Sequence, residues 1–106
     1  MTEKNTIIKE LRNLARHMFV GREGDVYIYG SQALGNASEG SDWDILIITD
    51  DSVSTADDFT KYAFPFAELG WQYGQQITPL HYTRTQWEKE SSTLFYHNVS
   101  SQALRL

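Results

Sequence analysis

Two short apolar runs separated by a glycine-containing loop constrain the fold of this chain more than any other feature. The first run, residues 25–29, reads Asp-Val-Tyr-Ile-Tyr, and the second, residues 42–49, ends in Ile-Leu-Ile-Ile-Thr. β-Branched and aromatic side chains at this density are typical of buried strands. Gly30, Gly35 and Gly40 interrupt the segment between the runs. The chain is therefore expected to build a sheet around these two strands.

Helical patterns surround the two runs. Apolar residues recur at helical spacing over about residues 5–20, and again over about residues 54–70, where Pro65 is expected to kink or divide the helix. Residues 74–82 are typical of a third strand, and residues 93–106 have the weaker periodicity of a last helix. Because long apolar helix faces need a sheet to cover, this order predicts an α/β (α+β) fold with a small mixed β-sheet and helices mainly on one face.

The expected strands lie near residues 25–30, 42–49 and 74–82. Residues 1–106 together are expected to form a single domain, since their number is the usual size of one. A capping box is expected to begin a short helix after the third strand, formed either by Thr83 with Gln86 or by Thr85 with Glu88.

The composition excludes several classes of protein. The chain has 106 residues, a formal net charge of −5 and no cysteine, so disulfides and cysteine-based zinc sites are ruled out. The sequence shows no basic stripe that would hold nucleic-acid phosphates, and stable nucleic-acid binding is not expected. Its apolar runs are too short to span a membrane, and nothing near Met1 resembles a secretory leader. We therefore expect a cytoplasmic protein.

The segment from residue 26 to residue 48 suits both a phosphate ligand and a metal ion. The first strand leads into Gly30 and Ser31, where glycine lets a phosphate approach the backbone and the serine hydroxyl adds a donor. Asp42 and Asp44 are two residues apart on a strand, so both carboxylates point to one side and can bind one hard cation. In a chain of net charge −5, an anionic ligand needs such a cation to offset repulsion.

The spacing of these residues resembles the signature of the DNA polymerase beta-like nucleotidyltransferase superfamily. The pattern is Gly-Ser, then a glycine four residues after the serine, then Ser-Asp-x-Asp. Six residues occupy its positions: Gly30, Ser31, Gly35, Ser41, Asp42 and Asp44. The short chain most resembles the minimal nucleotidyltransferases, a group often partnered with helical HEPN proteins.

The resemblance implies a role for each of these residues except Gly35, which is expected only to shape the loop. Gly30, Ser31 and Ser41 would bind a nucleoside triphosphate, with ATP as the expected ligand and Ser41 chiefly bracing the loop. Asp42 and Asp44 would be both the catalytic residues and the metal ligands, for Mg²⁺ or alternatively Mn²⁺. The implied reaction transfers a nucleoside monophosphate to an acceptor, which a protein could provide. A HEPN-type helical protein and a second copy of the chain are the candidate protein partners.

The sequence departs from the family pattern at the general base. The family carries a third carboxylate on the following strand, but residues 75–82 contain no Asp or Glu, and Thr78 or Gln76 stands where the acid is expected. His81 is the residue of this strand best suited to act as a base near neutral pH. Alternation along the strand, however, places His81 on the face opposite Tyr82 and away from the site.

Two functions from different classes remain open at this level. One is a nucleotidyltransferase, and the other is a catalytically weakened, antitoxin-like module that binds a HEPN partner. Basic residues that often follow Gly-Ser in minimal family members are replaced by Gln32 and Leu34. An acid that enters the site from elsewhere in the fold would favour the enzyme, whereas its absence would favour the module. The acceptor and the preferred base are left open.

Overall fold

The computed structural model describes residues 3–35, 37, 40–52 and 59–106 of the chain. In chain order its elements are α1 (Lys4–Met18), β1 (Gly24–Tyr29), α2 (Ser31–Leu34), β2 (Trp43–Thr49), the π-helical segment η2 (Phe59–Ala63), α3 (Phe64–Tyr73), β3 (Ile77–Thr83), α4 (Arg84–Lys89), α5 (Leu94–Gln102) and β4 (Leu104–Arg105). The three expected strands and the first helix are present close to their expected bounds. No helix of the described part combines the length and apolarity needed to cross a membrane.

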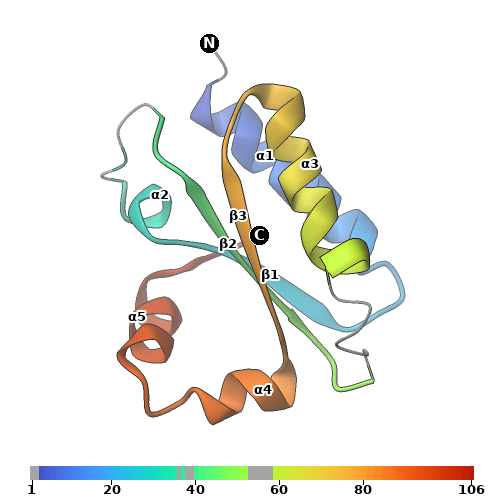
Figure 1. The fold of residues 1–106 in the computed structure, drawn as a ribbon, viewed down its shortest axis with the longest axis vertical. Helices are drawn as coiled ribbons and strands as arrows, with labels where there is room; N and C mark the ends of the chain where they lie inside the picture. The colour runs from blue at the N-terminus through green and yellow to red at the C-terminus, as the bar shows by residue number, and fades with distance from the viewer. Residues whose placement is uncertain (1–2, 36, 38–39, 53–58) are drawn as a thin grey trace.

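One mixed sheet forms the centre of the molecule, with strand order β3-β2-β1-β4 (Figure 1). β1 is antiparallel to both of its neighbours, β2 and β4. β2 and β3 are parallel, as expected when a helical crossover separates two strands. The prediction of a small mixed sheet is confirmed.

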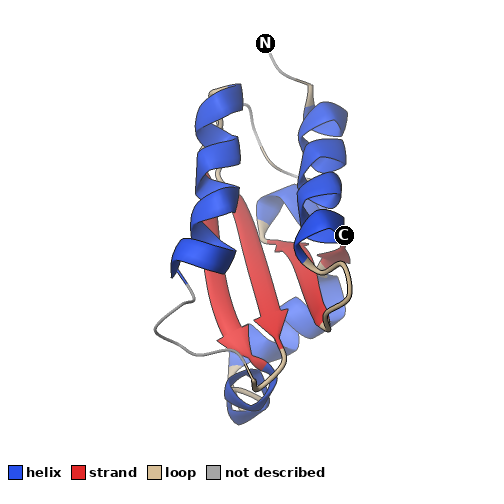
Figure 2. Cartoon of the chain, turned by 90° about the vertical axis from the view of Figure 1, so that its right-hand side faces the viewer, coloured by secondary structure: helices blue, strands red, loops and turns tan. Residues whose placement is uncertain are grey.

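Both faces of the sheet are covered, which explains why β2 is apolar at nearly every position. α1 and α3 lie side by side over one face (Figure 2) and form the larger core there. α4 and α5 pack on part of the opposite face, where a smaller core surrounds Trp87 and Val99. Alternate residues of β2 enter the two cores: Trp43, Ile45 and Ile47 the larger, Leu46 and Ile48 the smaller. The two longest helices thus share one face, as predicted.

The capping box forms at the first of the two expected positions. The backbone N–H of Gln86 donates to Oγ1 of Thr83 (3.3 Å), and the N–H of Thr83 donates to Oε1 of Gln86 (3.0 Å). Two donors at the start of α4 are satisfied in this way. Thr85 instead donates its N–H to Asp51 (2.9 Å), which ties α4 to the turn after β2.

The C-terminal prediction is wrong in part. α5 ends at Gln102, and the next residues form β4, which pairs with Tyr27 and Ile28 of β1 instead of continuing the helix. The N–H of Leu106 also donates to the carbonyl of Val26 (2.9 Å). The backbone groups on the open edge of β1 gain partners that a longer helix would leave unsatisfied. This competition explains the failure of the helical pattern.

The helix expected over residues 54–70 begins in a part of the chain, residues 53–58, that lies outside the described residues. Pro65 divides the described remainder as expected, because it occupies the first turn of α3 immediately after η2. α3 runs on to Tyr73 and ends at Gly74, whose φ of 65° is left-handed. The third strand therefore starts three residues later than expected, at Ile77.

Candidate functional site

The Gly30–Ser31 turn lies against the carboxylate of Asp44. Gly30 follows β1 with φ 73° and ψ −154°, a conformation open essentially to glycine alone. A Cβ at Gly30 would lie only 2.5 Å from Oδ2 of Asp44. Glycine is therefore required twice, once by the backbone conformation and once by the neighbouring carboxylate. This contact brings together the Gly30–Ser31 turn and the Asp-x-Asp strand, which are separate in the sequence.

The two predicted aspartates lie close enough to repel one another. Asp44 is half-buried in β2, opposite Tyr29 in the pairing of β1 with β2, whereas Asp42 is exposed just before the strand. Burial raises the pKa of the Asp44 carboxyl, and the negative charge of Asp42 raises it further. A bound cation would remove both penalties, so the pair suits a divalent metal ion.

The described residues supply two carboxylates to such an ion and no more. No group of three or more His, Cys, Asp or Glu side chains in that part of the chain could hold a metal. Mg²⁺ commonly takes one or two protein carboxylates and completes its octahedron with phosphate oxygens and water. Asp42 and Asp44 thus fit a metal ion that arrives with a triphosphate better than a metal ion held by protein alone.

The position expected for the third carboxylate is occupied by an exposed threonine. Thr78 is the partner of Asp44 in the parallel pairing of β2 with β3. Gln76 precedes the strand, and its carbonyl accepts the N–H of Trp43 (2.8 Å), so its backbone holds the start of β2 in place. Of the two candidates that the sequence offered, Thr78 is the one beside Asp44.

His81 lies on the other face of the sheet, as strand alternation predicts. Its Nε2 is 2.7 Å from Oγ1 of Thr49, and its ring stacks on Tyr62 with centroids 5.2 Å apart. Tyr62 belongs to the core beneath α1 and α3, whereas Tyr82 packs in the core beneath α4 and α5. His81 therefore has no access to the carboxylate of Asp44.

Gln32 is a site residue that the sequence did not predict. It is buried, with 7% of its surface exposed, and its Nε2 donates to the carbonyl of Ser41 (3.3 Å). Nζ of Lys4 donates in turn to the carbonyl of Gln32 (3.0 Å). The hydrogen bond to Ser41 ties α2, which begins at Ser31, to the residue before Asp42. No spacing rule marks this role, because it depends on a fold that buries one polar side chain of a four-residue helix.

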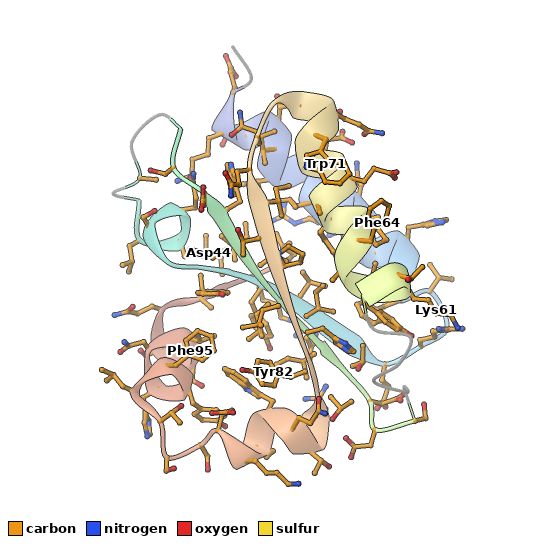
Figure 3. All side chains as sticks on the ribbon, in the orientation of Figure 1. Asp44, Lys61, Phe64, Trp71, Tyr82 and Phe95 are labelled. Carbon is orange, nitrogen blue, oxygen red and sulfur yellow. The ribbon has the colours of Figure 1, made fainter. Side chains whose placement is uncertain are left out.

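Aromatic side chains extend from Asp44 along the same face of the sheet. Figure 3 shows Asp44 beside α2, with Tyr82 further along the sheet towards α4 and Phe95 on α5. The rings of Tyr29 and Phe95 meet edge to face, with centroids 5.5 Å apart. Burial raises the pKa of Tyr29, and the charges of Asp44 and Tyr82 raise it further. Tyr29 therefore stays protonated at neutral pH and offers a hydroxyl, not a base.

Comparison with protein families gives one result for the sequence. A family model described as a nucleotidyltransferase domain matches residues 6–98. That range includes both aspartates, the Gly30–Ser31 turn and strands β1 to β3. None of the curated proteins matches the chain.

Comparison with solved structures gives the same fold. A toxin-antitoxin crystallised with AMP-PNP is 20% identical, with a TM-score of 0.57, over 98% of this chain and 72% of that chain. A tyrosine-to-alanine mutant of the toxin-antitoxin MntA-HpeT is 20% identical, with a TM-score of 0.55, over 100% and 72%. A mutant of the same complex with two aspartates changed to glutamate is 18% identical, with a TM-score of 0.57, over 98% and 72%.

Proposed function

The chain belongs to the nucleotidyltransferase domain family, and from this premise we propose that it binds a nucleoside triphosphate, preferentially ATP, together with Mg²⁺. The observation that carries the proposal is the contact between the Gly30 backbone and the Asp44 carboxylate. It puts a turn whose backbone a phosphate can approach next to a carboxylate whose pKa is raised by burial and by the charge of Asp42. Ser31 begins α2 directly after this turn, and Asp42 is the second carboxylate.

In the proposed complex each residue has a defined task. The Gly30 backbone and the Ser31 hydroxyl hold phosphate oxygens, while Asp42 and Asp44 hold the cation. Mg²⁺ supplies charge neutralisation at the phosphates when bound, and Mn²⁺ is the alternative ion. Ser41 braces the loop, since its carbonyl is held by Gln32.

The proposed reaction transfers a nucleoside monophosphate from the bound triphosphate to an acceptor, breaking the bond between the α- and β-phosphates and releasing pyrophosphate. A protein is the proposed acceptor class. Thr78 stands beside Asp44 where a general base is expected, so we propose that transfer is slow. A positioned base typically contributes about a hundredfold to ten-thousandfold in rate. We expect this activity in the cytoplasm.

The second candidate function is an antitoxin-like module that binds a helical protein partner and has a reduced nucleotide site. Two observations favour it: the threonine at the position of the third carboxylate, and the structural likeness to toxin-antitoxin complexes. The two candidates share nucleotide binding and differ in turnover. A HEPN-type protein is the proposed partner for either.

Calorimetric titration with ATP tests the shared part of the proposal. We expect binding with Mg²⁺ and none in EDTA, because a chain of net charge −5 that presents two aspartates repels a bare triphosphate. Asp42→Asn and Asp44→Asn should each weaken Mg²⁺-dependent binding at least about tenfold, since each removes a metal ligand. Glu88→Gln on the exposed surface of α4 removes the same charge elsewhere and should have no effect. Equal affinity for ATP in Mg²⁺ and in EDTA would contradict the proposed site.

A further inference from the structure

The charges of this acidic chain are unevenly distributed. Residues 4–22, which comprise α1 and the turn after it, hold five of the nine basic residues and one of the fourteen acidic residues. This segment therefore carries +4 and the remainder of the chain −9, against a net charge of −5. Such separation within one small molecule produces a local positive field in a negative surround.

The structure shows a short basic row that was not predicted from the sequence: Lys9, Arg12 and Arg16 lie along one flank of α1, which we call the basic flank. Spacings of three and four residues place them above one another on the helix, beside the buried stripe that faces the sheet. Lys9 and Arg16 are exposed and Arg12 is half-exposed. None of the three pairs with an acidic side chain in the described part of the chain. The row spans about 10 Å along the helix axis.

The basic flank adjoins a cavity between α1 and the edge of the sheet. The cavity has a volume of about 270 Å³, and Arg16 belongs both to it and to the basic flank. Figure 2 shows the C-terminal end of the chain, which carries β4, beside α1. Apolar side chains line part of the cavity: Ala15, Phe19, Val26 and Leu106. A molecule that met the basic flank could therefore bury an apolar group in the same place.

We propose that the basic flank and this cavity bind an acidic amphipathic helix of a protein partner. Carboxylates on one flank of that helix pair with Lys9, Arg12 and Arg16, and an apolar side chain from its neighbouring face fills the cavity. The proposal names the docking surface for the partner put forward under the proposed function, and it rests on that proposal for the existence of a partner.

The shape of the charge distribution favours a helix over a nucleic acid. A row of about 10 Å matches two turns of helix, whereas polynucleotide-binding proteins commonly neutralise about six to ten phosphates. A polynucleotide that extended past the basic flank would enter the field of the remaining −9. An acidic amphipathic helix carries its charge on one face, so it can contact the positive segment without reaching the acidic remainder of the chain.

A stapled helical peptide of about 18 residues provides the probe, with glutamates three and four residues apart on one flank and leucines on the adjoining face. Its binding is followed by fluorescence anisotropy at about 50 mM and about 300 mM salt. The test variant carries Lys9→Gln, Arg12→Gln and Arg16→Gln. A matched control carries Gln72→Glu, Ser91→Glu and Ser92→Glu, which changes the net charge by the same amount at exposed positions elsewhere.

We expect saturable binding to the wild type and to the control, weakened by salt, and at least about tenfold weaker binding to the test variant. Equal affinity for the wild type and the test variant would overturn the proposal, as would no saturable binding to the wild type. Tighter binding of an RNA oligonucleotide through the same three side chains would overturn it in favour of a nucleic-acid surface. Calorimetry with Mg²⁺ and ATP on the same proteins keeps the two proposals apart. Charge-dependent peptide binding without any ATP binding would leave the docking surface standing and remove the nucleotide site.

Discussion

Gly30 shapes the candidate site through both its backbone conformation and its lack of a side chain. Its positive φ turns the chain from β1 into α2, and its missing side chain leaves room for the Asp44 carboxylate. Gly35, at φ 76°, is left-handed as well but has no heavy atom within 4 Å of the place where a Cβ would be. Alanine substitutions at the two glycines therefore distinguish two effects. A strained backbone is expected at both positions, whereas a displaced carboxylate is expected only at Gly30.

Gly30→Ala should displace the carboxylate of Asp44 and weaken Mg²⁺-dependent ATP binding at least about tenfold. It should also destabilise the fold by about 1–3 kcal/mol, because alanine is excluded from this backbone conformation. Gly35→Ala serves as the control, with a cost of about 1–2 kcal/mol and unchanged binding. Thermal unfolding and calorimetry measure the two effects. Equal ATP affinity in both variants would show that the contact between Gly30 and Asp44 has no part in binding.

Asp44 is expected to oppose folding when no cation is bound. Its pKa is raised by burial and by Asp42, so folding favours the protonated carboxyl and disfavours the ionised one. The ionised group therefore lowers stability at neutral pH, and this penalty disappears as the pH falls through its raised pKa. Asp44→Asn should raise the melting temperature at pH 7 by a few degrees and have little effect at about pH 3.

Asp51→Asn should have the opposite sign and serves as the control for that experiment. Hydrogen bonds from Thr85 lower the pKa of Asp51, so its ionised form is favoured by the fold. Its contribution is present at neutral pH and is lost as the pH falls through the lowered pKa. If Asp44→Asn lowered the melting temperature at pH 7 in EDTA, the electrostatic description of the aspartate pair would be wrong.

At the scale of helices and strands, local sequence patterns predicted the elements whose formation depends on residues close together in the sequence. Dense β-branched and aromatic side chains marked β1 and β2, and helical spacing marked α1. The pattern could not predict β4, because a strand of two residues exists only through its pairing with Tyr27 and Ile28 of β1. It could not predict η2 either, since a π-helical segment has no simple spacing signature.

The candidate site also contains some residues that the sequence identified and others that only the structure revealed. Gly30, Ser31, Asp42 and Asp44 were identifiable from a linear motif, and the structure brings Gly30 and Asp44 into contact. The hydrogen bond from Gln32 to the Ser41 carbonyl was not identifiable, because it links α2 to the loop before β2, and their approach depends on the whole sheet. The choice between Thr78 and Gln76 likewise required the register of β2 and β3.

The link between α2 and the loop before β2 predicts that Gln32 positions the site without touching the ligand. Gln32→Met keeps the length of the side chain but makes it apolar and removes the donor to Ser41. Leaving that carbonyl without its partner should cost about 1 kcal/mol of stability and weaken Mg²⁺-dependent ATP binding several-fold. Gln72→Met, on the exposed surface of α3, is the matched control. A loss of stability with no change in ATP affinity would show that Gln32 stabilises the fold but does not position the site.

At the scale of the whole molecule, the proposed nucleotide site has a threonine, Thr78, at the position where the family pattern places its third carboxylate. The sheet places Thr78 beside Asp44, and it turns His81 away into the opposite core. We propose that the acidic remainder of the chain and the positive α1 provide two separate surfaces, one for a metal-bound nucleotide and one for a partner. Low intrinsic turnover is the property that we propose on the basis of these features.

The rate of AMP transfer from ATP labelled at the α-phosphate, followed with pyrophosphate release, tests this description most directly. In Mg²⁺ the wild-type rate should be low, and Thr78→Asp should raise it at least about tenfold by restoring a carboxylate beside Asp44. Gln76→Asp adds the same charge before the strand and should raise it less, while His81→Ala should leave it unchanged. Rapid transfer by the wild-type chain, abolished by His81→Ala, would contradict the assignment of this site.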